Sequence, residues 1–255
     1  MSRESKKATG GFGWRVWLGI AAAGVVFVSA AIAGLRVRDF AMTDPQFILS
    51  RDHKDALTIQ GMKYTSRAKV LRVFGSDFGR SVFAVPLAER RRRLLAIDWV
   101  EDASVSRIWP DRLVVRIHER TPVAFVIFPA GVLLIDSRGV LLDPPPQSQF
   151  AFPVLSGVKE EETEDQRRER VRCLARVQEE LGPQSKDLSE VDASDPDNIR
   201  IVAQIEHRTV ELILGDNNFG RRYQNFLSHY AEIAKHSPNA TRFDLRLDDR
   251  ITAED

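Results

Sequence analysis

The sequence has little of what most catalytic and nucleic-acid-binding sites require. Cys173 is the single cysteine among 255 residues, which excludes an internal disulfide, a cysteine-rich zinc site and an iron–sulfur cluster. Charge of one sign is also lacking. The 37 Lys and Arg residues nearly balance 36 Asp and Glu, so the net charge of +1 provides no strong field to gather nucleic acid. With 43% hydrophobic and 29% charged residues, the chain has the composition of a folded protein.

Motifs that carry catalysis are absent as well. The five histidines form no H-E-x-x-H pair and have no cysteine at zinc-ligand spacing. His118 and His229 are expected beside apolar stripes rather than in a site, and Cys173 is expected as a packed thiol in a helix. The glycines at 10–13 follow no strand, so they do not read as a phosphate loop. We therefore predict no catalytic residue, no cofactor, no metal ligand and no small-molecule substrate.

One long hydrophobic run is present near the N-terminus. It opens at Val16, closes at Leu35 and contains no charged residue. As a helix it rises ~30 Å, the thickness of the hydrocarbon core of a bilayer. Trp14 and Trp17 lie at its first boundary, where indole rings favour the membrane interface. The pattern predicts a transmembrane helix.

The charges flanking this run predict its orientation. Residues 1–15 carry Arg3, Lys6, Lys7 and Arg15 against Glu4, a net charge of +3, which leaves −2 for the rest of the chain. The positive-inside rule then places this tail in the cytoplasm and exports everything after the helix. A cleaved signal peptide is one alternative, although the run exceeds the usual ~7–15 apolar residues, and a buried soluble helix is another.

Residues 36–55 have weak periodicity and mixed charge, and we interpret them as a spacer. The next 65 or so residues alternate sharply and predict the order β-α-α-β-β. The expected elements are a strand at 56–61, a helix capped by Ser66, a helix starting near Pro86, and strands at 102–110 and 112–120. Within the second helix, Arg90 to Arg93 form the most basic run. Neighbouring helical residues are ~100° apart, so we interpret this run mainly as a solvated face, with a contact surface for an acidic partner or a lipid headgroup as the alternative.

The remainder of the chain is rich in short apolar strands. Strands are expected at 123–128, 132–136, 140–143, 199–203, 209–214 and 243–249, with a loop from 144 to 157. Thr163 and Gln166 form a capping box that predicts a helix ending at Gly182. Asn218 is expected to cap a last helix that ends at Ser237. The fold class is therefore α+β, with a second domain that is mostly antiparallel β with flanking helices.

The order of these elements and the residues at their ends resemble a known family. The segment from residue 56 to residue 126 resembles a POTRA domain of the bacterial cell-division FtsQ/DivIB family. The residues that carry the resemblance are Gly61, Trp99, Val100, Ala103, Val105, Arg107, Trp109, Pro110, Asp111, Glu119, Arg120, Pro122 and Ala124. Downstream, the stretches IDSRGVLL, FPVLSG, LILGD and FDLR are similar to the second, β-rich domain of that family.

The resemblance implies a function without catalysis. Members of the family are division scaffolds with a cytoplasmic tail, one inner-membrane helix and two periplasmic domains. The POTRA domain is associated with recruitment to the division septum. The second domain binds the small membrane proteins FtsB and FtsL, among other divisome components, and FtsB adds a strand to the sheet edge. The implied organisation is a tail (1–15), a transmembrane helix (16–35), a spacer (36–55), a POTRA domain (56–121), an FtsQ-type β domain (122–249) and a C-terminal tail (250–255).

Carried over by motif, the partner-binding site is the last strand, with a free edge, and the helix before it. The expected contact residues are Phe243, Asp244, Leu245, Arg246, Leu247, Asp248, Asp249, Arg221, Arg222 and Gln224. Arg246 is expected to point away from the core and pair with an acid of the partner. Leu247 stands where the family often has Tyr, and little chain follows Asp249.

Three alternatives remain open at this point. The charges of the last strand are also typical of a solubilising edge that discourages aggregation. A POTRA domain also occurs in outer-membrane assembly and secretion proteins, although the short barrel strands that such proteins carry are missing. An exported cell-wall enzyme would require a deep pocket with converging titratable groups.

Overall fold

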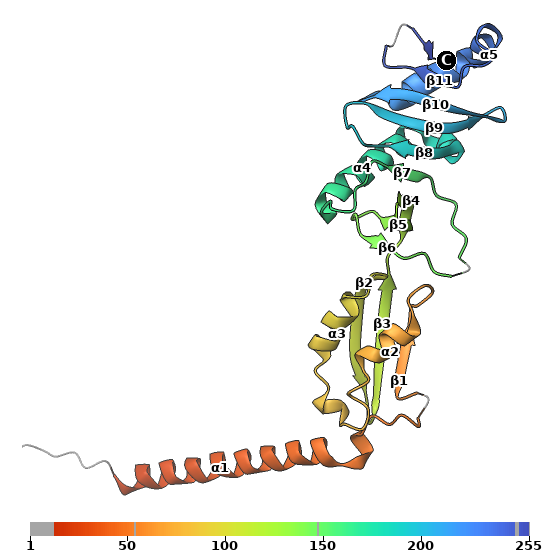
Figure 1. Cartoon of the computed structure of the whole chain (residues 1–255). Coiled ribbons are helices and arrows are strands. Elements are labelled where there is room, and N and C mark those ends of the chain that lie inside the picture. Colours follow the sequence, from red (N-terminus) through yellow and green to blue (C-terminus); the bar gives the residue numbers. More distant parts are fainter. Residues whose placement is uncertain (1–12, 54, 147, 248–249, 255) are drawn as a thin grey trace, which may run out of the picture. The chain divides into compact units, whose positions relative to one another are not determined.

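The computed structural model describes residues 13–53, 55–146, 148–247 and 250–254 (Figure 1). The chain divides into two compact units. The first unit contains the residues up to Gly61 together with 67–94 and 103–117. The second contains 62–66, 95–102 and everything from His118 onward.

The first unit begins with the long helix α1 (Trp14–Thr43), which has 30 residues. Within it, the stretch Trp17–Thr43 has a mean hydropathy of 2.3, is unburied, and is long and apolar enough to span a membrane. The predicted helix is therefore present but longer than expected, because it continues eight residues past Leu35 into the segment interpreted as a spacer. It ends where Asp44 precedes Pro45, since proline disfavours a helical conformation in the residue before it.

Residues 44–49 of the predicted spacer also have defined structure. A single 3₁₀ turn, η1 (Pro45–Phe47), follows α1, and the Asp44 carboxylate accepts a hydrogen bond from the Gln46 amide at 3.0 Å. Phe47 and Leu49 are buried. The spacer interpretation is wrong for residues 36–43, which belong to α1; the charged residues Arg36, Arg38 and Asp39 interrupt the apolar run there and masked its continuation.

The predicted β-α-α-β-β order is confirmed. A three-stranded sheet with order β1-β3-β2 is covered by two helices (Figure 1). Strand β1 pairs with β3 in parallel. The elements are β1 (Leu57–Gln60), α2 (Arg67–Val73), η2 (Val82–Ala84), α3 (Leu87–Leu95), β2 (Val100–Ile108) and β3 (Arg112–Glu119). Gly61 adopts a positive φ of 82°, and a Cβ there would lie 2.1 Å from the Ile117 carbonyl oxygen, so this position requires glycine.

The basic run on α3 is only partly solvated. Arg90 is buried and donates to both carboxylate oxygens of Asp77, at 2.6 and 2.8 Å, while Asp77 is itself fully buried. This bidentate pair raises the pKa of the Arg90 guanidinium despite the opposing effect of burial. Arg91, Arg92 and Arg93 are exposed, as expected for a solvated face.

The second unit contains a nine-stranded sheet with order β12-β11-β10-β9-β8-β7-β4-β5-β6 (Figure 1). Pairs β4–β7, β7–β8 and β10–β11 are parallel and the others are antiparallel, so the prediction of a mostly antiparallel sheet is confirmed. The strands are β4 (Pro122–Phe128), β5 (Gly131–Asp136), β6 (Leu141–Leu142), β7 (Val154–Ser156), β8 (Leu188–Asp192), β9 (Ile199–Ile205), β10 (Arg208–Gly215), β11 (Arg242–Asp244) and β12 (Thr252–Glu254).

Two helices pack in this unit, α4 (Glu164–Leu181) and α5 (Phe219–His236), and a 3₁₀ segment, η3 (Gly182–Asp187), follows α4. The capping box at Thr163 is confirmed. Asn218 stands at the N-cap of α5, but it has a left-handed φ of 55° and its side chain makes no capping bond, so its predicted capping role is wrong. The two helices contact each other, since the Gly220 amide donates to Glu180 at 3.2 Å.

Candidate partner-binding edge

The nine-stranded sheet ends in β12, not in the strand that the sequence predicted to be free. Strand β11 lies between β10, to which it is parallel, and β12, to which it is antiparallel. The pairing with β12 joins Arg242 to Glu254, Phe243 to Ala253 and Asp244 to Thr252. The predicted free edge along β11 is therefore covered by the chain's own last residues. Among the described residues, the open backbone edge belongs to β12, which falls in the segment expected to be a short tail.

Two of the predicted contact residues support the strand from inside. Phe243 and Leu245 are buried, and the Phe243 ring lies 5.0 Å from that of Phe226 on α5. The Leu245 amide donates to the Ile213 carbonyl on β10 at 2.9 Å. These contacts fix β11 against α5 and β10, so both side chains mainly position the strand.

The expected alternation of buried and exposed residues stops after Leu245. Leu247 was expected on the buried face, but its side chain is 53% exposed because the chain leaves the sheet after Asp244. Because Leu247 is exposed, its side chain is accessible to a partner, which a buried side chain would not be. Asp248 and Asp249 lie outside the described residues.

Arg246 points away from the core, as expected, but it already has an acidic partner. Its guanidinium donates to the Asp244 carboxylate at 3.0, 3.1 and 2.6 Å, and its backbone amide donates to the same carboxylate at 3.0 Å. Hydrogen bonding from Arg246 outweighs partial burial and lowers the pKa of Asp244. The Arg246 side chain is half exposed, so an acid of a second protein would compete with Asp244 for it.

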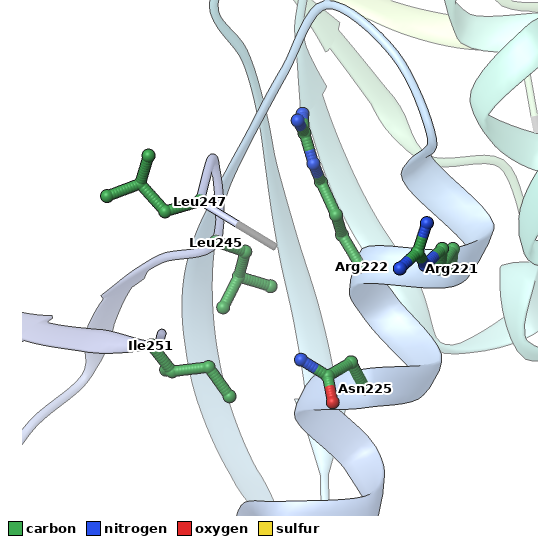
Figure 2. Close-up of a pocket in the computed structure, with 6 residues that line it drawn as sticks. All are labelled: Arg221, Arg222, Asn225, Leu245, Leu247 and Ile251. Carbon is green, nitrogen blue, oxygen red and sulfur yellow. The ribbon is translucent and has the colours of Figure 1, made fainter. Parts of the chain in front are cut away.

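The predicted contact residues on α5 also differ in where they lie: some line a hollow and one does not. A hollow of about 240 Å³ lies between α5 and the terminal loop, lined by Arg221, Arg222, Asn225, Leu245, Leu247 and Ile251 (Figure 2). Arg222 crosses to the sheet and donates to the carbonyls of Leu214 and Asn217. Gln224 is exposed on α5, but the next residue, Asn225, is the one that faces the hollow. Figure 2 shows Leu245, Ile251 and Asn225 directed into the same space.

A second hollow, of about 520 Å³, continues along α5 toward β12 and shares Asn225 and Ile251 with the first. Its lining residues are Asn225, His229, Glu232, Ile233, His236, Ser237, Arg250, Ile251 and Ala253. The helix residues among them recur every three or four positions, so they form one face of α5. This face was not among the predicted contact residues. Its helical spacing is visible in the sequence, but that spacing indicates a binding face only once β12 is known to return beside α5.

The described residues give no support for a metal site or for Cys173 as a nucleophile. No cluster of three or more His, Cys, Asp and Glu side chains there has a geometry that could hold a metal ion. Burial raises the pKa of the Cys173 thiol more than nearby Arg176 lowers it. A thiol with a raised pKa is a weak nucleophile at neutral pH. The arrangement at β12 and α5 instead suits binding: an open backbone edge beside a basic and apolar hollow.

Comparison with known proteins finds family models that match both regions. The model described as "POTRA domain, FtsQ-type" matches residues 55–120. The model described as "Cell division protein FtsQ/DivIB, C-terminal" matches residues 124–246. Both matches agree with the resemblance seen in the sequence, while the domain boundaries given above stay a prediction.

Individual relatives agree with the family models, and each carries the name "Cell division protein FtsQ". The protein of Koribacter versatilis is 35% identical over 253 residues, covering 97% of this chain and 71% of the relative. That of Novosphingobium aromaticivorans is 35% identical over 127 residues, covering 48% of this chain and 38% of the relative. That of Alcanivorax borkumensis is 27% identical over 175 residues, covering 66% and 61%.

Proposed function

Because this chain belongs to the FtsQ/DivIB family of cell-division proteins, we propose that it is a non-enzymatic divisome scaffold that holds FtsB- and FtsL-like partners at the septum. The observation that carries the proposal is the open edge of β12 beside the two hollows along α5. A scaffold requires a surface of this kind and no reacting group. Contacts with other divisome components, including those made by the POTRA domain, serve the same scaffold role.

The scaffold is anchored in the inner membrane by α1 as a single-pass protein. The N-terminal tail, with its net charge of +3, stays in the cytoplasm, and everything after α1 lies in the periplasm. Anchoring confines the binding edge to a layer above the membrane. This raises its effective concentration toward partners that are themselves membrane proteins, without any additional contact.

Partner binding proceeds by strand addition to β12. An extended partner segment pairs with the outward backbone groups of Thr252–Glu254, which gives affinity that is largely independent of sequence. Selectivity comes from the adjoining hollow. An apolar side chain of the partner packs on Leu247 and Ile251, and an acidic one lies near Arg221 and competes with Asp244 for Arg246. Phe243 and Leu245 position this edge from beneath.

Co-purification of the full chain with its FtsB- and FtsL-like partners tests this proposal. We expect Leu247→Glu to weaken the complex about tenfold or more, equivalent to about 1.4 kcal/mol, because a carboxylate then occupies the apolar side of the hollow. Val132→Glu is the matched control, since Val132 is similarly exposed, at 48%, on β5 of the same unit. Equal binding by both variants would contradict strand addition beside this hollow.

A further inference from the structure

The turn between β2 and β3 exposes two large apolar side chains. Ile108 is 42% exposed and Trp109 is 67% exposed. Adjacent apolar residues of this size at a hairpin tip form a patch that an isolated soluble domain normally avoids. No role in the scaffold function proposed above accounts for them.

This turn is joined by ring contacts to the end of the membrane helix. The buried Phe47 ring lies 5.2 Å from Trp109, 5.3 Å from Phe83 and 5.7 Å from Phe40, each with edge-on geometry. The Ser81 hydroxyl donates to the Ala41 carbonyl, in the last turn of α1, at 2.7 Å. Because Phe40 and Ala41 belong to α1 and Trp109 to the turn, the two features lie at the same end of the first unit.

The length of α1 sets the level of that end in a bilayer. The stretch Trp17–Thr43 has 27 residues. At 1.5 Å per residue it rises ~40 Å, close to the ~40–45 Å thickness of a bilayer with its headgroups. The helix therefore ends at the outer boundary of the headgroup layer. Trp109 is attached at this level, which is where indole rings are enriched in membrane proteins.

Net charge does not attract this end of the first unit to a membrane surface. In the sequence, Arg36 and Arg38 near the end of α1 are followed by Asp39, and Arg112 after the turn is preceded by Asp111, so the charges nearly balance. The guanidinium of Arg107 is occupied by the carbonyls of Val82 and Val85, at 2.7 and 2.8 Å. The attraction therefore comes from the apolar surface of the two side chains and does not require anionic lipid.

We propose that the Ile108–Trp109 turn lies in the outer headgroup layer of the bilayer that α1 spans and forms a second membrane contact. This inference depends on the membrane anchoring in the proposed function. Two contacts, one by α1 and one by the turn, restrict rotation of the first unit about the helix end. The unit is then presented to its partners in one orientation with respect to the membrane.

Quenching of tryptophan fluorescence by brominated lipid tests the contact. The full chain is reconstituted in zwitterionic phosphatidylcholine vesicles whose acyl chains carry bromine near the headgroup. In a Trp14→Phe/Trp17→Phe background, only Trp99 and Trp109 emit. Trp99 is buried in protein, at 6% exposure, and serves as the unquenched reference. We expect bromine to remove most of the Trp109 emission, and the additional change Trp109→Phe to abolish the loss.

Matched variants separate the contact from the anchor. Ile108→Glu is expected to reduce the quenching of Trp109, whereas Ile127→Glu, at a residue 61% exposed on β4, leaves it unchanged. In the chain that retains Trp14 and Trp17, quenching of those residues reports insertion of α1. Quenched Trp14 and Trp17 with unquenched Trp109 would overturn the contact alone and leave the turn facing water or another protein. No quenching at any of the three would overturn both the contact and the membrane anchor.

Discussion

The two edge strands of the nine-stranded sheet, β6 and β12, have different surroundings. At the β6 edge, Leu142 is fully buried, and the Trp99 indole N–H donates to the Asp143 carbonyl at 2.9 Å. The rings of Tyr64, Phe150 and Phe152 stack beside it. At the β12 edge, Thr252 and Ala253 are exposed beside the hollows along α5.

In the function proposed above, the edge beside β6 contributes stability and the edge at β12 contributes recognition. An exposed sheet edge invites pairing with other chains, and proteins usually cover it. Here, aromatic side chains pack on Leu142 beside β6, the covered edge, whereas β12, the open edge, lies next to a basic and apolar surface. In the function proposed above, the open edge is the one that accepts a partner strand.

The largest expected effect is at the covered edge. Trp99→Ala removes a buried ring and the donor to the Asp143 carbonyl, and we expect it to lower the free energy of unfolding by ~3–5 kcal/mol. Urea denaturation measures this loss. Leu247→Ala is the matched change at the open edge, where an exposed side chain costs about 0.5 kcal/mol or less. Similar losses from the two variants would contradict the distinction between the edges.

A smaller effect is expected from Gly215→Ala, behind the open edge. Gly215 has a positive φ of 79°, and a Cβ there would lie 2.9 Å from the Arg222 guanidinium and 3.3 Å from the Arg246 side chain. We expect a loss of ~1–2 kcal/mol from the backbone strain, together with weaker partner binding as the two arginines shift. Gly182 has a positive φ of 57°, and no atom beyond its chain neighbours lies within 4 Å of a Cβ placed there. Gly182→Ala should therefore show the strain without the loss of binding.

The smallest effect concerns the dependence of stability on pH at the open edge. The pKa of Asp244 is lowered in the folded protein relative to 3.8, so the folded state binds fewer protons there than the unfolded chain. The stabilisation from Asp244 is thus fully present above pH 3.8 and is lost as pH falls through the lower, folded pKa. For a half-exposed pair this amounts to ~0.2–1 kcal/mol.

Urea unfolding of the protein and of Asp244→Asn across this pH range checks the prediction. The difference in unfolding free energy should be constant near neutral pH and shrink below pH 3.8. A difference that grows as pH falls would show that Arg246 does not stabilise the ionised carboxylate.

The sequence predicted most of the elements with strong local signals. The apolar run of α1, the capping box at Thr163 and the β-α-α-β-β order all depend on periodicity or on capping within a few residues. Strands β7, β8 and β12 were missed, because three to five residues are too few to show alternation. Their pairing partners lie far away in the sequence, so local propensity does not reveal them.

The site was predicted less well than the fold for the same physical reason. The FDLR stretch begins in β11, next to the open edge strand, but the burial of Phe243 and Leu245 depends on α5 and β10. The antiparallel pairing of β11 with β12 requires the chain to reverse between Asp244 and Thr252, and the sequence analysis had no local signal for that reversal. The burial of Arg90 likewise depends on Asp77, which no helical spacing connects to it.

Hydrogen–deuterium exchange of the full chain, with and without its FtsB- and FtsL-like partners, tests the central claim most directly. If a partner strand adds to the open edge, the amides of Thr252–Glu254 become protected on binding, while those of Leu141–Leu142 at the covered edge keep the same exchange rate. Unchanged exchange at β12 in a formed complex would contradict strand addition and place the partner elsewhere on the protein.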